Sequence, residues 1–397
     1  MGEPGPLGQQ LRRLRRERGL SQAELAEMAD VSSDLVAKLE QGARMTARLT
    51  SLTKLARALD VEMSELIGRR PRLDRTADET SLLAVRDVLL DPEALPGLDR
   101  TDDLGEPTPL QQLGEALNIA WAHYWAGRFG LLAVMLPGLI GEARASFARA
   151  GADVSAVLAQ AYQLAGCLNV HMGAEDLAAI GAERAIAVAA QGSDQLQWAS
   201  VSGTYSWVLL AQGRYDLAER HATRMAQLIE PSLSSATPEH LTVWGALVLA
   251  AVAPAAAAGR AENVSDIVTL ARAGAALMEH DRHDYQTDFG PTQVAVQATH
   301  GYAVLGHSGR ALGAAREVRR EGLRSIAWGR FLIDVAQAQV DAGRDDSAIT
   351  TLQHSRDVSE EWFRHQPPAR AMIGDLVERR RHVTPALRDI ARSLELY

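Results

Sequence analysis

The sequence predicts an all-α protein, in which a short N-terminal helical domain precedes a long array of paired helices. Three observations support this fold class. Apolar residues recur with the period of a helix along most of the 397-residue chain, and alternating β-branched residues are scarce. Helix-start signals precede several of these stripes, as where Ser21 is followed by Glu24. After residue 110, a glycine turn signal returns at intervals typical of helix pairs.

The stretch from Ser21 to Gly42 predicts two short helices joined by a tight turn. Ser21 and Glu24 form a capping box, which starts the first helix, and Ser32 is placed to cap the second. The inward positions are Leu25, Ala26 and Ala29 in the first helix and Val36 and Leu39 in the second. A gap of about three residues between the helices is the helix-turn-helix geometry, in which the second helix enters the DNA major groove.

A resemblance supports this interpretation. The segment GLSQAELAEMADVSSDLVAKLEQG, with LARALDVEMSELIG after it, resembles the Cro and phage-repressor type of helix-turn-helix, the XRE family. The resemblance covers residues 1–70 and implies a five-helix DNA-binding domain. Asp30 departs from the family, which prefers Gly at this left-handed turn position, but Asp tolerates that conformation better than most residues.

The other helices of this domain follow from apolar stripes. Residues 7–18 place Leu11 and Leu14 inward and a row of arginines outward: Arg12, Arg13, Arg15, Arg16 and Arg18. Some of these arginines are expected to contact phosphates, and a solvated charged face is the alternative. A fourth helix carries Leu49, Leu52, Leu55, Ala56 and Leu59, and a fifth begins at 63–67.

The resemblance also implies a DNA-contacting surface. Gln22 is expected to contact the DNA backbone or a neighbouring base, while Ser33, Asp34 and Lys38 are expected to face base edges. Lys38 can donate to guanine O6 and N7, and Asp34 can accept from cytosine N4. The loop after Gly42 runs along the phosphate backbone in the resembling family. The expected DNA-binding residues are therefore Gln22, Ser32, Ser33, Asp34, Lys38, Arg44, Thr46, Arg48, Arg12 and Arg16.

The charge distribution agrees with a DNA-binding head. The whole chain has a formal net charge of -9, but residues 1–72 hold 13 basic and 10 acidic residues, a net charge of +3. The remainder holds 28 basic and 40 acidic residues, a net charge of -12. Because an acidic body repels DNA, this asymmetry orients the head toward it.

Residues 71–110 predict a linker with one helix, Thr80 to Leu90, followed by a stretch rich in Pro, Gly and Asp. From 111 to 397 the pattern predicts helix pairs. The turn signals centre on Gly127, Gly173, Gly213, Gly259, Gly309 and Gly343. LLAQGRYDLAERHATRMAQLIEP resembles a tetratricopeptide repeat. The resemblance implies a tetratricopeptide-like α-solenoid, in which stacked pairs share one core and mediate effector binding and dimerisation.

The tetratricopeptide register places the first helix of each pair on the inner face. Trp121, Tyr124 and Trp125 share one helical face there, at spacing i, i+3, i+4. Such aromatics with nearby amides and imidazoles suit a mostly apolar ligand with a few polar groups, whereas ordinary packing between repeats is the alternative. The expected ligand-binding residues are Trp121, Tyr124, Trp125, Gln160, Gln163, His171, Trp207, Thr299, His307, Arg330 and Gln337.

Other signals point to no further chemistry. The uncharged stretch from Leu241 to Gly259 meets the length of a membrane span, but we expect a buried helix because the repeat pattern needs one there. His280 and His283 could hold a metal, although a solvated loop or helix end is expected. Cys167 is expected to be a core residue rather than a redox sensor. No phosphate-binding loop or hydrolase motif occurs, so neither an enzyme nor a cofactor nor a bound metal is expected.

These patterns together predict a cytoplasmic, sequence-specific DNA-binding transcriptional regulator. Its full layout resembles the actinobacterial regulators that fuse these two modules. We expect a homodimer on a double-stranded DNA operator, responding to a small-molecule or peptide effector, with no membrane partner. The alternative is a DNA-anchored scaffold that binds another protein and no small molecule, and a catalytic site assembled from distant residues is a further alternative.

Overall fold

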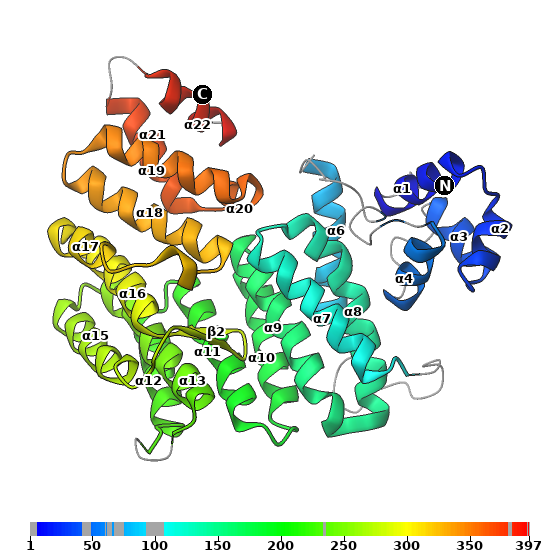
Figure 1. Ribbon diagram of the computed structural model, residues 1–397, viewed down its shortest axis with the longest axis horizontal. Coiled ribbons are helices and arrows are strands. Elements are labelled where there is room, and N and C mark those ends of the chain that lie inside the picture. The colour runs from blue at the N-terminus through cyan, green and yellow to red at the C-terminus, as the bar shows by residue number, and fades with distance from the viewer. Residues whose placement is uncertain are drawn as a thin grey trace. The chain divides into compact units, whose positions relative to one another are not determined.

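The computed structural model describes residues 6–41, 49–59, 61, 66, 75–92, 107–232, 236–379, 383–394 and 396. These residues are mostly helical, which confirms the all-α fold class (Figure 1). They form two compact units, one of residues 1–124 and 128–165 and the other of residues 125–127 and 166–397. The predicted division at residues 70 and 110 therefore stays a prediction.

The first unit begins with the helices of the predicted head. The helices of this unit are α1 (Pro6–Glu17), α2 (Gln22–Met28), α3 (Ser33–Glu40), α4 (Leu49–Ala58), α6 (Arg75–Leu90), α7 (Leu110–Trp125), α8 (Phe129–Ala150), the short 3-10 helix η2 (Gly151–Val154) and α9 (Ser155–His171). The division between the two units falls before the last residue of α7 and within α9, between Ala165 and Gly166. The predicted linker helix is confirmed as α6, and it starts five residues earlier than expected.

A single apolar cluster holds α1 to α4 together. Its buried members are Leu7, Leu11, Leu14, Leu25, Ala26, Ala29, Val36, Leu39, Leu55, Ala56, Leu59 and Leu66. Helix α1 lies so close to α3 that a Cβ at Gly8 would fall 2.1 Å from the carbonyl oxygen of Leu39. Of the predicted fifth helix at 63–67, only Leu66 lies among the described residues.

Helices α6 and α8 pack against each other in the first unit. Arg144 on α8 donates to the Asp91 carboxylate at 2.7 Å and also to the carbonyl of Val88, so it fastens the end of α6. The same guanidinium donates to the hydroxyl of Tyr162 on α9 at 2.7 Å. One cation therefore links three helices of this unit.

The second unit consists of helix pairs with one inserted β-hairpin. Its elements are α10 (Glu175–Ala189), α11 (Gln195–Ala211), α12 (Tyr215–Leu228), α13 (Pro238–Ala250), α14 (Val252–Ala257), α15 (Ala261–Ala275), β1 (Arg282–Asp284), β2 (Thr287–Phe289), α16 (Pro291–Val304), α17 (Ser308–Ala315), η3 (Arg320–Gly322), α18 (Ser325–Asp341), α19 (Asp345–Val358), α20 (Glu360–Arg364), α21 (Pro367–Arg379) and α22 (Pro385–Ser393). Consecutive helices pack most extensively against each other, such as α10 with α11 and α18 with α19. This is the expected pattern of an array of pairs.

The turns within the pairs share one backbone motif. Gly127, Gly173, Gly213, Gly259 and Gly343 have φ between +68° and +74°, as predicted from the turn signals. In each turn the amide after the glycine bonds back to the helix, as where Arg214 N donates to the Leu209 carbonyl at 2.9 Å. This is the Schellman motif, which ends a helix at a left-handed residue.

One predicted turn is wrong. Gly309 lies inside α17, and the turn of that pair is at Gly306, with φ +71°. The amide of His307 donates to the Tyr302 carbonyl at 2.8 Å, which completes the same motif three residues earlier. Both glycines precede a polar residue, so the local sequence did not distinguish them.

The core of the second unit runs from α11 to α18 and includes Phe289 of the hairpin. Phe289 on β2 is fully buried and meets Trp244 on α13 edge-on, with ring centroids 6.4 Å apart. A Cβ at Gly245 would lie 2.3 Å from the Phe289 ring, so only a glycine admits this ring. The stretch Leu241 to Gly259 is confirmed as buried helix, in α13 and α14.

Two segments of the described residues are long and apolar enough to span a membrane, 129–171 and 238–257. In the most apolar part of each segment, 56% of the first and 72% of the second are buried within the protein. Core helices pass the same test of length and composition, so these segments are weak evidence for a membrane role. Cys167 is buried, as predicted for a core residue.

Candidate nucleic-acid interface and effector surface

Helices α2 and α3 form the predicted helix-turn-helix, and local side-chain bonds fix both helix starts. The Ser21 hydroxyl accepts from the Glu24 amide at 3.2 Å, while the Ser21 amide donates to the Glu24 carboxylate at 2.7 Å. The Ser32 hydroxyl accepts from the Leu35 amide at 3.2 Å. These bonds satisfy amides that a helix leaves open, so the sequence determines where each helix begins.

The turn between the two helices depends on Asp30. Its φ is +48°, which confirms the left-handed conformation expected at this position. The Val31 amide donates to the Ala26 carbonyl at 3.0 Å and closes the turn. Lys54 on α4 lies 2.8 Å from the Asp30 carboxylate, so the turn is also held from the next helix.

The outward face of α3 carries the residues expected to read DNA. Ser33, Asp34 and Lys38 are exposed, whereas Val36 and Leu39 on the opposite face are buried. The Lys38 ammonium lies 2.7 Å from the Asp34 carboxylate. An exposed ion pair of this kind contributes little, so Lys38 can exchange this partner for a base or a phosphate at small cost.

A buried ion pair holds α3 against α1, which corrects the predicted orientation of Arg15. Arg15 is 8% exposed rather than on the outward basic face. Its guanidinium donates to both carboxylate oxygens of Glu40 at 2.6 and 2.8 Å, and to the Leu20 carbonyl at 2.6 Å. Arg15 and Glu40 are 25 residues apart in sequence, so the helical periodicity of α1 alone did not reveal their contact.

Gln22 joins the same network. Its amide nitrogen donates to Glu40 at 2.8 Å, so its side chain is half-buried and one of its groups is already used. Burial alone would raise the pKa of Glu40, but the hydrogen bonds from Arg15 and Gln22 outweigh it and hold that pKa below its ordinary value. The network therefore connects α1, α2 and the C-terminal end of α3.

The remaining DNA-binding residues are divided by what the structure describes. Arg12 and Arg16 are exposed on α1, which agrees with their predicted outward face. Arg44, Thr46 and Arg48 lie outside the described residues, so the predicted phosphate contacts of this loop stay predictions.

The aromatic pair at the end of α7 is part of the core. Trp121 is 4% and Tyr124 5% exposed, and their rings meet edge-on with centroids 5.4 Å apart. Tyr124 also lies 5.9 Å from the Phe129 ring. This burial favours the packing alternative for both side chains. Gln163 is likewise buried, and Gln160 is half-buried.

Three predicted ligand residues come together in the second unit. The imidazole of His171 meets the Trp207 ring edge-on, with centroids 5.2 Å apart. Burial, followed by the positive charges of Arg330 and His365, lowers the pKa of His171 to about 3. His171 is therefore neutral at physiological pH, beside an aromatic ring and two cationic or titratable groups.

The other predicted ligand residues have local roles. The Thr299 hydroxyl donates to the Ala295 carbonyl on its own helix at 2.8 Å, and Thr299 is 1% exposed. Gln337 donates to Asp341 at 2.8 Å, one turn along α18. His307 is exposed in the turn before α17. These three are not brought together with His171.

Trp125 is bound to the inserted hairpin. Its indole N–H donates to the Gln286 side chain at 3.1 Å, and the guanidinium of Arg324 lies 3.7 Å from its ring centroid. Arg324 also donates to Gln286 at 3.0 Å and to the Asp288 carboxylate. No local pattern in the sequence marks Gln286, Asp288 or Arg324, because they meet only through the hairpin.

The hairpin itself replaces the loop or helix end expected around His280. Tyr285 and Gln286 form its two-residue turn with φ of +52° and +60°. Turns of this type usually carry Asn-Gly, whose absence explains why no hairpin was predicted. His283 on β1 faces Asp288 on β2, with Nδ1 2.5 Å from the carboxylate.

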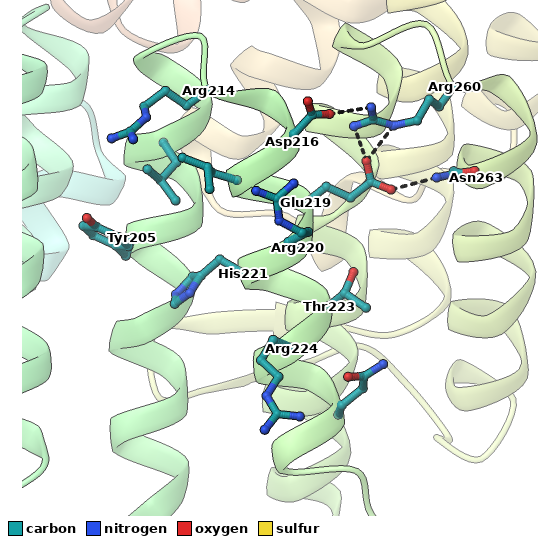
Figure 2. A pocket seen from close by; sticks show the side chains of 13 residues that line it. Tyr205, Arg214, Asp216, Glu219, Arg220, His221, Thr223, Arg224, Arg260 and Asn263 are labelled. Atoms are coloured by element: carbon teal, nitrogen blue, oxygen red, sulfur yellow. Dashed lines mark hydrogen bonds and ion pairs between the residues drawn. The ribbon is translucent and has the colours of Figure 1, made fainter.

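An open pocket of about 900 Å³ lies elsewhere in the second unit, along α12 (Figure 2). Its walls come from α11, α12 and the start of α15. None of the predicted ligand-binding residues lines it. Its charged residues are Arg214, Asp216, Glu219, Arg220, Arg224 and Arg260.

The comparison with protein families identifies the head. Residues 11–66 match the family described as Helix-turn-helix. Over 121 residues the chain is 30% identical to the immunity repressor protein of Bacillus phage phi105, covering 30% of this chain and 83% of that repressor. The chain belongs to the helix-turn-helix family of this repressor.

A second helix-turn-helix relative is the uncharacterized transcriptional regulator RghRB of Bacillus subtilis (strain 168). It is 36% identical over 74 residues, which are 19% of this chain and 53% of that protein. Among solved structures, PlcR of Bacillus thuringiensis in complex with the peptide PapR7 and DNA shares 15% identity and a TM-score of 0.31. That similarity covers 70% of this chain and 96% of PlcR.

Membership in the helix-turn-helix family gives the function of the head. The chain is a DNA-binding transcriptional regulator, which confirms the coarse prediction from the α2–α3 motif. The resemblance to the phage-repressor type is likewise confirmed, while the narrower resemblance to actinobacterial regulators stays a prediction.

Proposed function

We propose that this protein is a homodimeric regulator that reads a specific operator with α3 and responds to a small-molecule or peptide effector bound by its helix-pair body. The proposal keeps a head of residues 1–70, a linker of residues 71–110 and a body of residues 111–397. The cytoplasm is the expected compartment, and no catalytic role is proposed.

The exposed face of α3 carries the proposal for the head. Ser33, Asp34 and Lys38 offer a hydroxyl, a carboxylate and an ammonium group to solvent on one side of a capped helix. These are the groups that distinguish base pairs in the major groove. The buried opposite face and the Arg15–Glu40 pair keep the helix in place.

The body is proposed as the effector-binding part because it brings aromatic and polar groups together at one place. The His171–Trp207 pair near Arg330 offers a neutral imidazole, an indole ring and a guanidinium. Such a set suits a ligand that is mainly apolar with a polar or anionic group. An effector bound there must prefer one state of the dimer in order to change operator affinity.

Lys38→Ala tests the reading of DNA. We expect the full-length variant to lose about 1 to 3 kcal/mol of discrimination at one or two operator positions, because a lysine contact to a guanine edge is removed. Selection from a random DNA pool, followed by affinity measurements on single-position variants of the operator, gives this value. Arg316→Ala on the exposed face of the body is the matched control, and it should leave discrimination unchanged. Equal weakening on all sequences would make Lys38 a phosphate contact instead.

A further inference from the structure

Four arginines line the pocket along α12. We call it the α12 groove and define it by Tyr205, Arg214, Arg220, His221, Arg224 and Arg260, which all line it. A second hollow of about 690 Å³ shares Arg214, Arg220 and Arg260. In Figure 2, Arg214, Arg220 and Arg224 follow one another along the pocket, with Tyr205 and His221 beside them.

Both carboxylates of the groove pair with one arginine. Arg260 donates to the Asp216 carboxylate at 2.7 Å and to the Glu219 carboxylate at 2.8 Å. Asn263 donates to the other oxygen of Glu219 at 2.8 Å. Hydrogen bonding to Asp216 is the main reason that the pKa of Arg260 is raised. These acidic side chains are thereby directed to Arg260, as the dashed lines of Figure 2 show.

The other three arginines have no ion-pair partner among the residues that the structure describes. Arg214, Arg220 and Arg224 are exposed, and each lines the pocket. With four arginines and two carboxylates, Asp216 and Glu219, the lining of the groove carries a net charge of +2. This surface belongs to residues 73–397, which carry a net charge of -12.

These charges stand where helix electrostatics disfavours them. Arg220 and Arg224 are one helical turn apart, a spacing at which like charges repel each other. Arg214 is the N-cap residue of α12 and makes no capping bond, and a cation there opposes the helix dipole. A bound anion would relieve both unfavourable interactions, because it compensates the charges and also favours the positive end of a helix.

The uncharged wall of the groove is fixed in place. His221 Nε2 lies 3.1 Å from the Ser202 carbonyl, and burial lowers the pKa of this imidazole, so it is neutral and donates that hydrogen bond. The Tyr205 ring meets it edge-on at 5.5 Å, and the Tyr205 hydroxyl donates to Glu183 at 3.2 Å. One side of the groove is therefore a hydrogen-bonded aromatic wall, and the other carries the exposed arginines of α12.

We propose that the α12 groove binds a small polyanion that carries two or more phosphate or carboxylate groups. Its volume lies within the range of about 300 to 1,000 Å³ of small-molecule sites. Arg220 and Arg224 are about 6 Å apart along the helix and can hold one anionic group. Arg214 lies about 15 Å from Arg224 along the helix and binds a second group. Guanidinium groups recognise phosphate and carboxylate through paired hydrogen bonds.

Calorimetric titration of the full-length protein at constant ionic strength tests this proposal. The probes are inorganic pyrophosphate and tripolyphosphate for phosphate, citrate for carboxylate, and sulfate as a control for simple screening. We expect at least one of the three polyanions to bind at least tenfold more tightly than sulfate. The preferred probe then tells phosphate from carboxylate. If none of them binds more tightly than sulfate, the proposal is wrong.

Two double variants locate the binding. The double variant Arg220→Gln, Arg224→Gln should bind the preferred polyanion at least tenfold more weakly than the unchanged protein. The control variant Arg316→Gln, Arg319→Gln removes two exposed charges elsewhere in the body. It should change the affinity for the polyanion less than twofold. An equal loss in both would show general charge attraction and would contradict a site. The midpoint of thermal unfolding checks folding, and Arg214→Gln alone gives a second, milder variant with the same expected direction.

Two other occupants have their own outcomes. If the groove variant loses affinity for a non-operator duplex, with a shallower salt dependence, then the groove contacts DNA and the proposal fails. If only a hexaglutamate peptide binds, and no small polyanion does, the ligand class is wrong. Because binding is measured without operator DNA, this result is independent of the proposed regulatory function, which the Lys38→Ala experiment tests separately.

Discussion

The Arg15–Glu40 pair is a buried ion pair that joins α1 to α3 in the DNA-binding head. Replacing Glu40 by Gln leaves the guanidinium of Arg15 buried without an opposite charge, because Arg15 is 8% and Glu40 3% exposed. We expect Glu40→Gln to lower the free energy of unfolding of the head by about 3 to 5 kcal/mol. Hydrogen exchange of α1 and α3 amides in the full-length chain measures it, with the helices of the second unit as an internal reference. Glu17→Gln breaks an exposed pair with Arg13 and should change exchange little.

The same pair predicts a pH dependence. Because the pKa of Glu40 is lower in the folded than in the unfolded head, its stabilisation is complete at neutral pH and is lost as pH falls through the folded value. The ordinary value for Glu is about 4.3, so protection of α1 and α3 should decline only below about pH 4. In the Glu40→Gln variant this component of the decline should be absent. An unchanged acid profile would argue against the pair as its source.

Asp30 is the other residue at which backbone conformation can be tested alone. Its φ of +48° is accessible to Gly without cost and is unfavourable for Ala. We therefore expect Asp30→Gly to be more stable than Asp30→Ala by about 1 to 2 kcal/mol. Both variants lose the contact with Lys54, so their difference isolates the turn. Hydrogen exchange of the α2 and α3 amides measures the stability of both variants. Equal stabilities would contradict the predicted difference.

At the level of elements, the turn glycines separate the cost of a left-handed residue from that of helix propensity. A Cβ at either Gly306 or Gly309 would meet nothing within 4 Å. Gly306→Ala should destabilise the α16–α17 pair by about 1 to 2 kcal/mol, because its φ is +71°. Gly309→Ala lies inside α17 and should stabilise it by up to about 1 kcal/mol.

Thermal unfolding or exchange of α17 amides measures both variants. The two Gly→Ala substitutions, three residues apart, are expected to change the stability of the α16–α17 pair in opposite directions. The reverse result would place the turn at Gly309, where the sequence pattern had put it.

What could be predicted from the sequence was what neighbouring residues decide. Ser21 and Ser32 cap their helices through bonds to amides three residues away, so the start of each motif helix was predictable. The turn glycines act in the same local way. Arg15 was misplaced because Glu40, its partner, is 25 residues distant, and a charged residue at an inward position looks like an outward one.

The candidate effector site was less predictable for the same reason. Trp121 and Tyr124 have the spacing of a binding face, but periodicity shows only that side chains share a face and not whether another helix covers it. The α12 groove was missed because its charge depends on a cross-helix pairing. Arg260 takes both carboxylates from Arg220 and Arg224, and Glu219 lies 41 residues from it in sequence.

For the whole molecule, the proposed function requires two heads on one operator. Sedimentation velocity of the full-length protein should give twice the 42.8 kDa of one chain. The selected operator should contain two inverted half-sites about 10 base pairs, or a multiple of that, apart. Inserting five base pairs between them should weaken binding strongly, because it turns one half-site to the other side of the duplex. A monomer that binds one half-site with full affinity would contradict the dimer.

The hairpin between α15 and α16 has a consequence for how the second unit can move. Its tip holds the Ser200 hydroxyl of α11 through the Tyr285 carbonyl at 2.5 Å, and Gln286 accepts from Trp125 and from Arg324. Its base is anchored by Phe289 in the core. The ribbon therefore holds Ser200 on α11 and Arg324, the residue before α18, in addition to the contacts between sequence neighbours. Any bending that moves α11 away from the start of α18 must break the hydrogen bonds at the ribbon's tip.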